Sequence, residues 1–309
     1  MDIFRDEMKD RLGDALSFSV PLKNHTSIQT GGESDYFYVA SDINSLINAI
    51  TVAKKLNIPI KVIGGGSNIV FSDKGFRGMV IKNLSKNIVI NKEGGEVIAD
   101  SGILVSMLLN LLTSQELGGI EFMAGIPGTL GGAVYGNAGS KSQYIGDFVK
   151  GVTLIDYSGP EIKILNKDHD WLDFYYRSSK LKRTHSDLVI LTIQMRMAQK
   201  RSDEIIKKIQ DNLNHRMLNQ PLGEKSCGSW FKNPGKLPEQ AAGYLLDRSG
   251  AKRLKFGGAA FSKKHANFLI NRKNASSSDL KQLAEIAKRS VLENFDVNLE
   301  EEIEYIGEW

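Results

Sequence analysis

Cysteine is almost absent from this chain, since Cys227 is the single one among 309 residues. One thiol excludes an internal disulfide and a cysteine-rich metal site, and this scarcity favours a reducing compartment. We therefore expect a cytoplasmic protein without a bound metal. We interpret Cys227 as a packed bystander, because a lone cysteine has no resolving partner for redox chemistry.

Long apolar runs and a strong charge imbalance are also missing. The most hydrophobic stretch, Ile103–Leu112, falls far short of the ~20 residues that cross a bilayer. The N-terminal residues are charged, unlike the apolar core of a signal peptide. Forty basic residues stand against 36 acidic ones, a net charge of +4 without the clustering typical of nucleic-acid binders. The sequence predicts a soluble protein that binds neither membranes nor nucleic acids.

The length is sufficient for two or three domains of mixed helices and strands. Helical spacing of apolar residues predicts a short helix over residues 1–20, one capped by Asp42, a buried one over Ile103–Leu112 that ends at Gly118 and Gly119, one after Asp203 and one from Ser278. Near residue 200 the interleaved short strands and helices give way to a longer helical pattern, and we place a domain boundary near Ala198–Asp203. Strands are expected at Ile60–Ile63, Met79–Ile81, Ile88–Ile90, Val97–Ala99, Val152–Asp156, Leu188–Met195 and Val297–Ile306.

A first glycine-rich segment spans Val62–Val70 and reads VIGGGSNIV. Three glycines after a strand would let backbone N–H groups approach a phosphate, with Ser67 and Asn68 as further donors. A tight turn between two strands explains the same residues equally well. The segment is neither a Walker loop, because no Gly-Lys-Ser/Thr follows, nor a Rossmann fingerprint.

A second glycine-rich segment, Gly119–Gly139, holds seven glycines and almost no charge. A surface linker of this length is normally polar. The uncharged composition indicates instead a backbone that packs against a flat, buried partner, such as a flavin and its diphosphate. A structural glycine hairpin is the less favoured alternative.

The residues GGGSNIVFSDKGFRGMVI and, further on, GIEFMAGIPGTLGGAVYGNAG resemble the UDP-N-acetylenolpyruvoylglucosamine reductase family. That family belongs to the FAD-binding superfamily of vanillyl-alcohol oxidase, and the resemblance extends from Asn24 to the C-terminus. It implies an α+β fold: an FAD-binding domain over residues 1–200, with α/β subdomains at about 20–80 and 81–200, and a C-terminal α/β substrate domain over 201–296. Residues 297–309 would form a strand that returns to the active site.

The resemblance implies bound FAD and a set of residues that contact it. Because residues 64–73 contain no histidine or cysteine, we expect the FAD to be non-covalent. The implied contact residues are Gly64, Gly65, Gly66, Ser67, Asn68, Gly125, Pro127, Gly128, Thr129, Gly131, Gly132, Ala133, Asn137, Ala138 and Gly139.

The family reaction reduces an enolpyruvyl ether on a UDP-linked amino sugar, with hydride taken from NADPH. It needs a cation for the carboxylate, a stabiliser of the enolate-like state and a proton donor. The sequence YYRSS matches the family's Tyr-Arg-x-Ser motif and assigns the first role to Arg177, whose guanidinium can hold a carboxylate through two hydrogen bonds. A structural or surface arginine is the ordinary alternative.

The sequence SCGSWFKNP resembles the family motif Gly-Ser-x-Phe-Lys-Asn-Pro and assigns the proton donor to Ser229. Ser226 is the nearest rival, and turn formation beside Gly228 is the alternative explanation for Ser229. Near the C-terminus the match assigns the catalytic carboxyl to Glu302. Strand alternation would place Glu300, Glu302 and Glu304 on one face, and we interpret the three neighbouring glutamates as a solvated strand edge. These neighbours are Glu300, Glu301 and Glu304.

The substrate domain supplies further candidates through the same resemblance. The implied substrate-binding residues are Arg216, Asn233, Lys252, His265 and Asn267. A structural, hydrogen-bonding role is the alternative for His265. The expected partners are the UDP-linked enolpyruvyl sugar and NADPH, and we expect a monomer.

The chain departs from the family pattern at two places on the expected FAD side. Thr30 stands where an apolar residue is usual, and Ser140-Lys141-Ser142 replaces Ala-Tyr-Gly. The short gap between Arg177 and Leu188 leaves no room for an extra tyrosine-bearing substrate lid, which indicates the shorter branch of the family.

Two other functions fit parts of the sequence. A flavin oxidase of the same superfamily would use the glycine segments but would not need Arg177, Ser229 and Glu302 together. A non-catalytic module that binds a nucleotide or nucleotide sugar would not bind FAD.

Overall fold

The structure, a computed structural model, describes residues 3–140, 142–184 and 187–309. Lys141, part of one departure from the family pattern, lies outside the described residues. The chain forms two compact units that alternate along the sequence. Unit 1 comprises Met1–Phe18, Tyr36–Gly65 and Gly78–His215, and unit 2 comprises Ser19–Asp35, Gly66–Arg77 and Arg216–Trp309.

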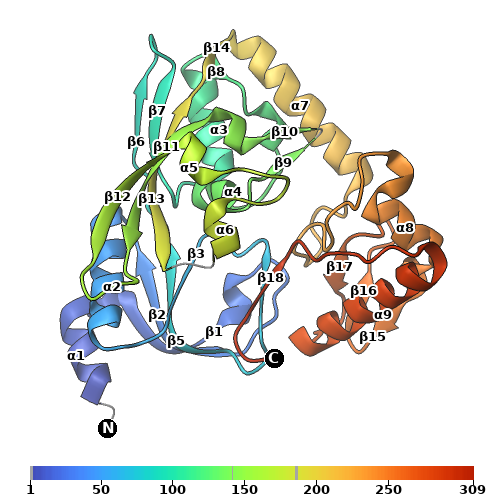
Figure 1. Ribbon diagram of the computed structural model, residues 1–309, viewed down its shortest axis with the longest axis horizontal. Helices are drawn as coiled ribbons and strands as arrows, with labels where there is room; N and C mark the ends of the chain where they lie inside the picture. The colour runs from blue at the N-terminus through green and yellow to red at the C-terminus, as the bar shows by residue number, and fades with distance from the viewer. Residues whose placement is uncertain (1–2, 141, 185–186) are drawn as a thin grey trace. The chain divides into compact units, whose positions relative to one another are not determined.

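Unit 1 contains a five-stranded antiparallel sheet with strand order β12-β11-β13-β7-β6. Two helices, α3 and α4, accompany this sheet (Figure 1), and their apolar residues share one hydrophobic core with it. The strands of the sheet are β6 (Ile88–Asn91), β7 (Glu96–Asp100), β11 (Val149–Asp156), β12 (Lys163–Asp168) and β13 (Leu188–Arg196). The helices are α3 (Val105–Ser114), α4 (Leu130–Tyr135), α5 (His169–Leu172) and α6 (Lys180–Thr184). Two short ladders pair β9 (Gly139–Ser140) with β10 (Gln143–Tyr144) and β8 (Leu117–Gly118) with β14 (Ala198–Gln199).

A second sheet has the order β1-β2-β5-β3, with β3 parallel to β5. Its core in unit 1 is made with two helices, and Met8, Leu46 and Ile50 are fully buried there. The elements are α1 (Ile3–Leu12), β1 (Leu16–Pro21), β2 (Glu33–Ala40), α2 (Ile43–Lys55), β3 (Ile60–Ile63) and β5 (Phe76–Asn83). The division between the units falls within β1, β2 and β5 and within α7 (Ser202–Asn219).

Unit 2 has a core of its own around Trp230 and the long helix α9. Ser276 caps α9 by accepting from the N–H of Asp279, and Asp73 accepts from the N–H groups of Ser277 and Ser278. The elements are β4 (Ile69–Phe71), α8 (Ala242–Arg248), β15 (Lys255–Phe256), β16 (Ala259–Phe261), β17 (Leu269–Asn271), α9 (Ser277–Phe295) and β18 (Glu304–Ile306). β18 runs parallel to β4, so the end of the chain pairs with the segment after the first glycine run.

Most predicted elements are confirmed, including the Asp42 cap, which forms a capping box with Ser45. Three predictions were wrong in their ends. The first helix, α1, stops at Leu12, before Gly13 with its left-handed backbone (φ 65), and Leu16–Pro21 form β1. Helix α3 stops at Ser114, and the residue with left-handed backbone is Glu116 (φ 58) instead of a glycine. The last strand covers only Glu304–Ile306, because the chain before it bridges Phe231 and then changes partner to β4.

The boundaries of the two units also differ from those of the predicted domains, which cover residues 1–200, 201–296 and 297–309. Two N-terminal segments, 19–35 and 66–77, belong with the C-terminal unit. The predicted domains are assignments of function and stay a prediction.

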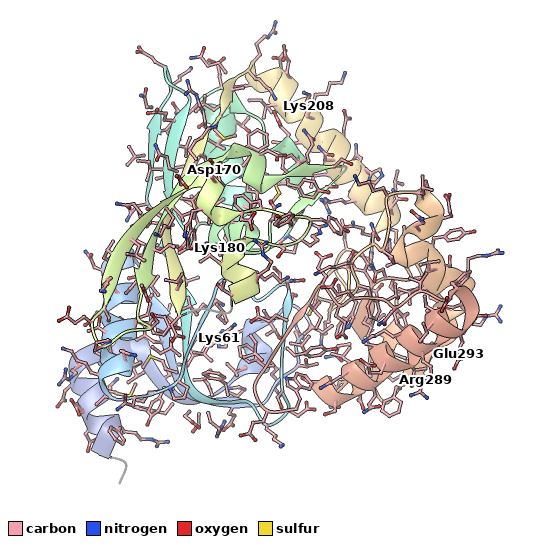
Figure 2. The ribbon with its side chains drawn as sticks, in the orientation of Figure 1. Lys61, Asp170, Lys180, Lys208, Arg289 and Glu293 are labelled. Carbon is pink, nitrogen blue, oxygen red and sulfur yellow. The ribbon has the colours of Figure 1, made fainter. Side chains whose placement is uncertain are left out.

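Charged side chains of both signs lie at the surface of both units. Lys208 in unit 1 and Arg289 and Glu293 in unit 2 are examples with exposed side chains (Figure 2). This mixture agrees with the small net charge. Within the described residues, none of the helices has the length and apolar character that a membrane crossing requires.

Candidate active site

The two glycine segments pack directly on each other in unit 1. A Cβ on Gly64 would lie 2.2 Å from Oγ1 of Thr129, and a Cβ on Gly65 would lie 2.9 Å from Cα of Gly128. Contacts this short are not tolerated, so both positions require glycine: Gly64 leaves room for the side chain of Thr129, and Gly65 for the backbone of Gly128. Segments that are more than 60 residues apart in sequence therefore form one surface.

This surface is uncharged and made largely of main chain. Gly65, Gly125, Pro127 and Gly132 are exposed, although Thr129 beside them is buried. A flat aromatic group can lie close to such a surface because, apart from the ring of Pro127, the exposed residues named are glycines without side chains. The residues present therefore fit the predicted FAD, which they would contact through backbone atoms.

Other predicted cofactor residues have internal roles in unit 1. Thr129 caps α4 by accepting from the N–H of Gly132 at 3.4 Å. The side chains of Thr129, Ala133 and Asn137 are all buried, at 3%, 8% and 4% exposure. These side chains therefore lie inside unit 1, and their contact with FAD stays a prediction.

Arg177 lies in a tight turn between α5 and α6. Tyr175 and Ser178 exchange two backbone hydrogen bonds, of 2.9 and 3.1 Å, across this turn. Arg177 has φ 55, a left-handed conformation that is uncommon for a residue with a side chain. Such a conformation persists where the surrounding turn imposes it, and the functional role of Arg177 stays a prediction.

In unit 2 the motif around Ser229 runs antiparallel to the segment around Glu302. Phe231 bridges Glu301, and the N–H of Glu302 donates to the carbonyl of Trp230 at 2.8 Å. Ser229 precedes Trp230, so the two predicted catalytic residues are one position out of register across this ladder. Arg177 belongs to unit 1, and its convergence with Ser229 and Glu302 stays a prediction.

Asn267 holds the Ser229 motif through its side-chain amide. Its Oδ1 accepts from the N–H of Phe231 at 2.9 Å, and its Nδ2 donates to the carbonyl of Phe231 at 2.8 Å. Its carbonyl also accepts from the N–H of Trp230 at 2.8 Å. The Asn267 side chain is 2% exposed, and its amide makes the two hydrogen bonds to Phe231 that the backbone of a neighbouring strand would otherwise make.

Asn68, which was predicted to contact FAD, is bonded to the Glu302 segment. Its Nδ2 donates to the carbonyl of Glu302, and its own carbonyl accepts from the N–H of Glu304, both at 3.1 Å. Ser27 adds a link to the Ser229 motif, because its hydroxyl donates to the carbonyl of Ser226 at 2.7 Å. The backbone of unit 2 thus gathers the end of the first glycine segment, Ser229 and Glu302.

Glu301 corrects the interpretation of the three neighbouring glutamates as a solvated edge. Its Oε1 accepts from Nε1 of the fully buried Trp230 at 3.2 Å and from the hydroxyl of Tyr305 at 2.6 Å. Burial, together with the nearby charge of Glu301, raises the pKa of Tyr305 and keeps this phenol protonated as a donor. Glu300 does follow the expectation, since it is exposed and pairs with Lys232.

A pocket of about 360 Å³ in unit 2 collects most of the predicted substrate-binding residues around Ser229. The remaining lining includes Tyr244, Asp247 and Lys264, which sequence reasoning missed because nothing local marks them. The predicted residues in the lining are Ser229, Asn233, Lys252, His265 and Asn267.

The pocket carries positive charge beside a neutral imidazole. Lys252 pairs with Asp247 at 2.9 Å, and Lys264 bonds the carbonyl of Met217. Burial, and then the charge of Lys252, lower the pKa of His265 against the opposing effect of Asp247. Cationic lysines with a neutral histidine suit an anionic, hydrogen-bonding ligand such as a diphosphate.

Two predicted residues lie away from this lining. Arg216, near the end of α7, donates to Gln220 at 3.3 Å and does not line the described pocket. Cys227 is buried in the core of unit 2, where its thiol donates to the carbonyl of Ile69 at 3.4 Å. Burial raises the pKa of this thiol, which confirms Cys227 as a packed residue.

Sequence reasoning missed a second pocket, of about 460 Å³, in unit 1. Two residues of the Arg177 turn, Tyr175 and Tyr176, line this pocket together with Asn137, Tyr144 and several aspartates. Because its residues come from four separated segments, no motif marks it.

Comparison with known proteins defines the class first. Residues 34–164 match the model of an FAD-binding domain, and residues 220–306 match the C-terminal domain of UDP-N-acetylenolpyruvoylglucosamine reductase. A variant of Phl p 4 that is described as a glucose oxidase shares the fold, at 16% identity, with a TM-score of 0.50 over 63% of this chain and 44% of its own. The protein is therefore a flavoprotein oxidoreductase with the predicted α+β, FAD-binding fold.

The particular family follows from similarity over the full chain. A UDP-N-acetylenolpyruvoylglucosamine reductase from Caldanaerobacter subterraneus is 36% identical over 309 residues, 99% of each chain. The enzyme of that name from Bacillus subtilis is 33% identical over 97% of each chain. The solved structure of the reductase from Thermus caldophilus, 28% identical, matches 93% of this chain and 98% of its own with a TM-score of 0.76. The chain belongs to the UDP-N-acetylenolpyruvoylglucosamine reductase family, which confirms the predicted resemblance and the predicted FAD.

Proposed function

We propose that this protein reduces UDP-N-acetylglucosamine enolpyruvate to UDP-N-acetylmuramate, a step in the synthesis of peptidoglycan precursors, with NADPH as the source of hydride. Bound FAD would accept the hydride and pass it to the methylene carbon of the enolpyruvyl group. The observation that carries the proposal is the pocket of unit 2, where Ser229 shares a lining with Lys252 and Lys264 and directly precedes Trp230, whose carbonyl accepts from the N–H of Glu302.

Each protein group has one task in this reaction. Arg177 holds the carboxylate of the enolpyruvyl group. Ser229 donates the proton of its hydroxyl to the carbon next to that carboxylate, and Glu302 assists this transfer. Lys252 and Lys264 supply positive charge for the diphosphate.

The remaining contacts follow from where the residues lie. Asn233 and His265 line the same pocket and would hydrogen-bond the sugar or the nucleotide. The glycines of unit 1 would carry a non-covalent FAD. Both the nucleotide-linked substrate and NADPH are metabolites of the cytoplasm, where we place the protein, and we expect it to act as a monomer.

The decisive experiment separates the two half-reactions. In Ser229→Ala, flavin reduction by NADPH should be unchanged, whereas reoxidation by the enolpyruvyl substrate should fall by about 10²- to 10⁴-fold, the usual contribution of a placed proton donor. Stopped-flow absorbance of the flavin measures both steps.

Ser226→Ala is the matched control, because it removes the rival hydroxyl of the same motif and should leave both half-reactions intact. Equal loss of both steps in Ser229→Ala would contradict the assigned role. Oxygen consumption that does not depend on NADPH would instead favour a flavin oxidase.

A further inference from the structure

Asn137, which follows α4 and Gly136, is hydrogen-bonded to the turn that carries Arg177. Asn137 donates Nδ2–H to the carbonyl of Tyr175 at 2.8 Å, and its Oδ1 accepts from the N–H of Gly146 at 3.0 Å. Its side chain is 4% exposed and its backbone is left-handed, with φ 44. Both ends of a buried amide are therefore committed to main-chain groups, which fixes its orientation.

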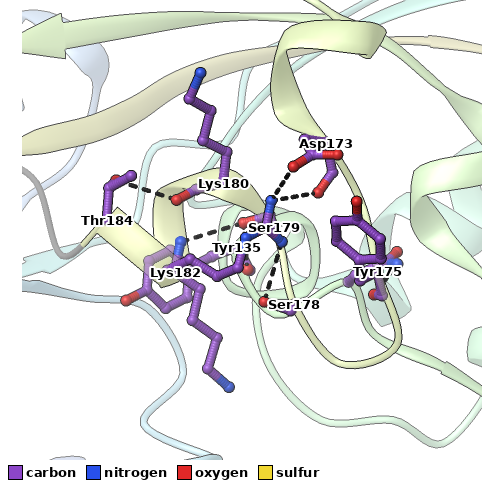
Figure 3. A network of polar contacts seen from close by, with 10 residues as sticks. Tyr135, Asp173, Tyr175, Ser178, Ser179, Lys180, Lys182 and Thr184 are labelled. Carbon is purple, nitrogen blue, oxygen red and sulfur yellow. Dashed lines mark hydrogen bonds and ion pairs between the residues drawn. The ribbon is translucent and has the colours of Figure 1, made fainter.

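A second bond ties the same segment to the other end of the turn. The hydroxyl of Ser179, which is fully buried, donates to the carbonyl of Tyr135 at 2.7 Å (Figure 3). Ser179 directly follows the turn Tyr175–Ser178. Tyr135 and Asn137, which are two positions apart in the chain, are thus hydrogen-bonded to the two ends of the turn.

The hydrogen bonds that Arg183 makes at the surface of the turn fix it less firmly than these two buried hydrogen bonds. Arg183 bonds the hydroxyl of Ser178 at 3.3 Å and the carboxylate of Asp173 at 2.5 Å (Figure 3), but these groups are exposed or partly exposed. Exposed ion pairs contribute little to fixing a conformation. The buried amide of Asn137 and the hydroxyl of Ser179 are the firm supports.

The turn needs such support because Arg177 has φ 55. Left-handed backbone in a residue with a side chain is unfavourable and persists only where the surroundings impose it. Asn137 holds the carbonyl of Tyr175, which also accepts the N–H of Ser178 and so closes the turn. Without the amide, the turn is free to relax and to turn the guanidinium away.

We propose that Asn137 is a positioning residue for Arg177: its amide holds the strained turn that presents the guanidinium to the carboxylate of the substrate. This inference rests on the proposed function, since it gives Asn137 an effect through the role of Arg177. It also links the second glycine segment, in which Asn137 lies two residues before the end, to the carboxylate site. It differs from the predicted contact of Asn137 with FAD, which would act on the flavin.

The test is the substitution Asn137→Asp. The carboxylate keeps the size of the side chain and the acceptor for Gly146 N–H, but it places an oxygen against the carbonyl of Tyr175. Reoxidation of the flavin by the enolpyruvyl substrate should slow on the order of 10- to 100-fold, with a raised KM for that substrate, as expected for a misplaced binding group. Flavin content and the rate of reduction by NADPH should stay at wild-type values.

The double variant decides whether Asn137 acts through Arg177. When Arg177→Ala is already present, Asn137→Asp should cause no further loss, because the group it positions is gone. The same loss in both backgrounds, or a lost flavin, would overturn the inference. Asn212→Asp is the matched control: it removes an amide donor to the carbonyls of Glu121 at 3.1 Å and Lys208 at 2.9 Å, neither of which belongs to the turn, and it should behave as wild type.

Two further outcomes keep the inference separate from its premise. If Asn137→Asp fails to fold, Ser179→Ala removes the second buried bond to the turn and should give the same pattern with a smaller loss. Wild-type protein that does not oxidise NADPH with the enolpyruvyl substrate would refute the proposed function. An active wild type with additive losses would refute only the role of Asn137.

Discussion

The glycine surface of unit 1 and the Ser229 region of unit 2 are built in opposite ways. In unit 1 the surface exists because side chains are missing: Gly64 and Gly65 allow the backbone to reach Gly128 and Thr129. In unit 2 the motif is held by side chains that are present: the amide of Asn267 bonds the backbone of Phe231, and the carboxylate of Glu301 accepts from the indole of Trp230. The first construction is sensitive to added atoms and the second to lost hydrogen-bond partners.

The largest expected effect is on the glycine surface. A Cβ on Gly132 would meet its nearest neighbour, Oγ1 of Thr129, only at 3.6 Å, so Gly132→Ala should fold normally. The added methyl group would, however, stand between the exposed backbone and the flavin. Overpacking of about 1–3 kcal/mol predicts an affinity for FAD that is lower by about 10- to 100-fold. Titration of the apoprotein with FAD measures this affinity.

Gly159→Ala is the control for this experiment, because its Cβ would lie 3.9 Å from the nearest atom in a loop of unit 1 away from both glycine segments. It should bind FAD as the wild type does. Wild-type affinity in Gly132→Ala would instead favour a purely structural glycine loop.

An effect of similar free energy, on stability, is expected from the carboxylate that supports unit 2. Glu301→Ala would leave the indole N–H of Trp230 and the hydroxyl of Tyr305 without their acceptor. The indole N–H is fully buried, and leaving it unsatisfied costs about 1–3 kcal/mol of the free energy of unfolding, whereas the hydroxyl of the partly exposed Tyr305 can bond water instead. Urea unfolding of Glu301→Ala measures this loss.

Glu300→Ala sharpens the result, since Glu300 is exposed and its pair with Lys232 should contribute only about 0–1 kcal/mol. If the two variants were equally stable, the buried network would have no special role.

The smallest effect concerns Thr30, the departure from the apolar residue usual in the family. Its side chain is 3% exposed, and its Oγ1 has no hydrogen-bond partner among the described residues. Thr30→Val keeps the shape and removes the unsatisfied hydroxyl, so it should stabilise the protein by about 1 kcal/mol. Thermal unfolding of the two proteins is the measurement, and a lower melting temperature for Thr30→Val would show that the hydroxyl is satisfied in solution.

Local pattern predicted the parts of this protein that depend on neighbouring residues. Apolar spacing located α2, α7 and α9, because each must bury one face. The predicted strands correspond to β6, β7, β11 and β13 of the five-stranded sheet, whereas the edge strand β12 was missed because its side chains are mostly exposed. Alternation failed for the last strand, where burial of Leu299, Ile303 and Ile306 follows a change of partner and not a period of two. Glu301 was misinterpreted for the same reason, since its donors are defined only once Trp230 lies opposite.

The amino-acid sequence by itself determined the family, the expected FAD and the positions of the glycine segments and of Ser229. These are matters of residue type and short spacing, which are visible along one dimension. Only the tertiary structure decided that Asn137 bonds a turn 38 residues away, that Asn267 holds Phe231 and that Asn68 bonds the Glu302 segment. Such contacts depend on which backbone groups a buried amide meets after folding, and any asparagine offers the same donors and acceptor beforehand.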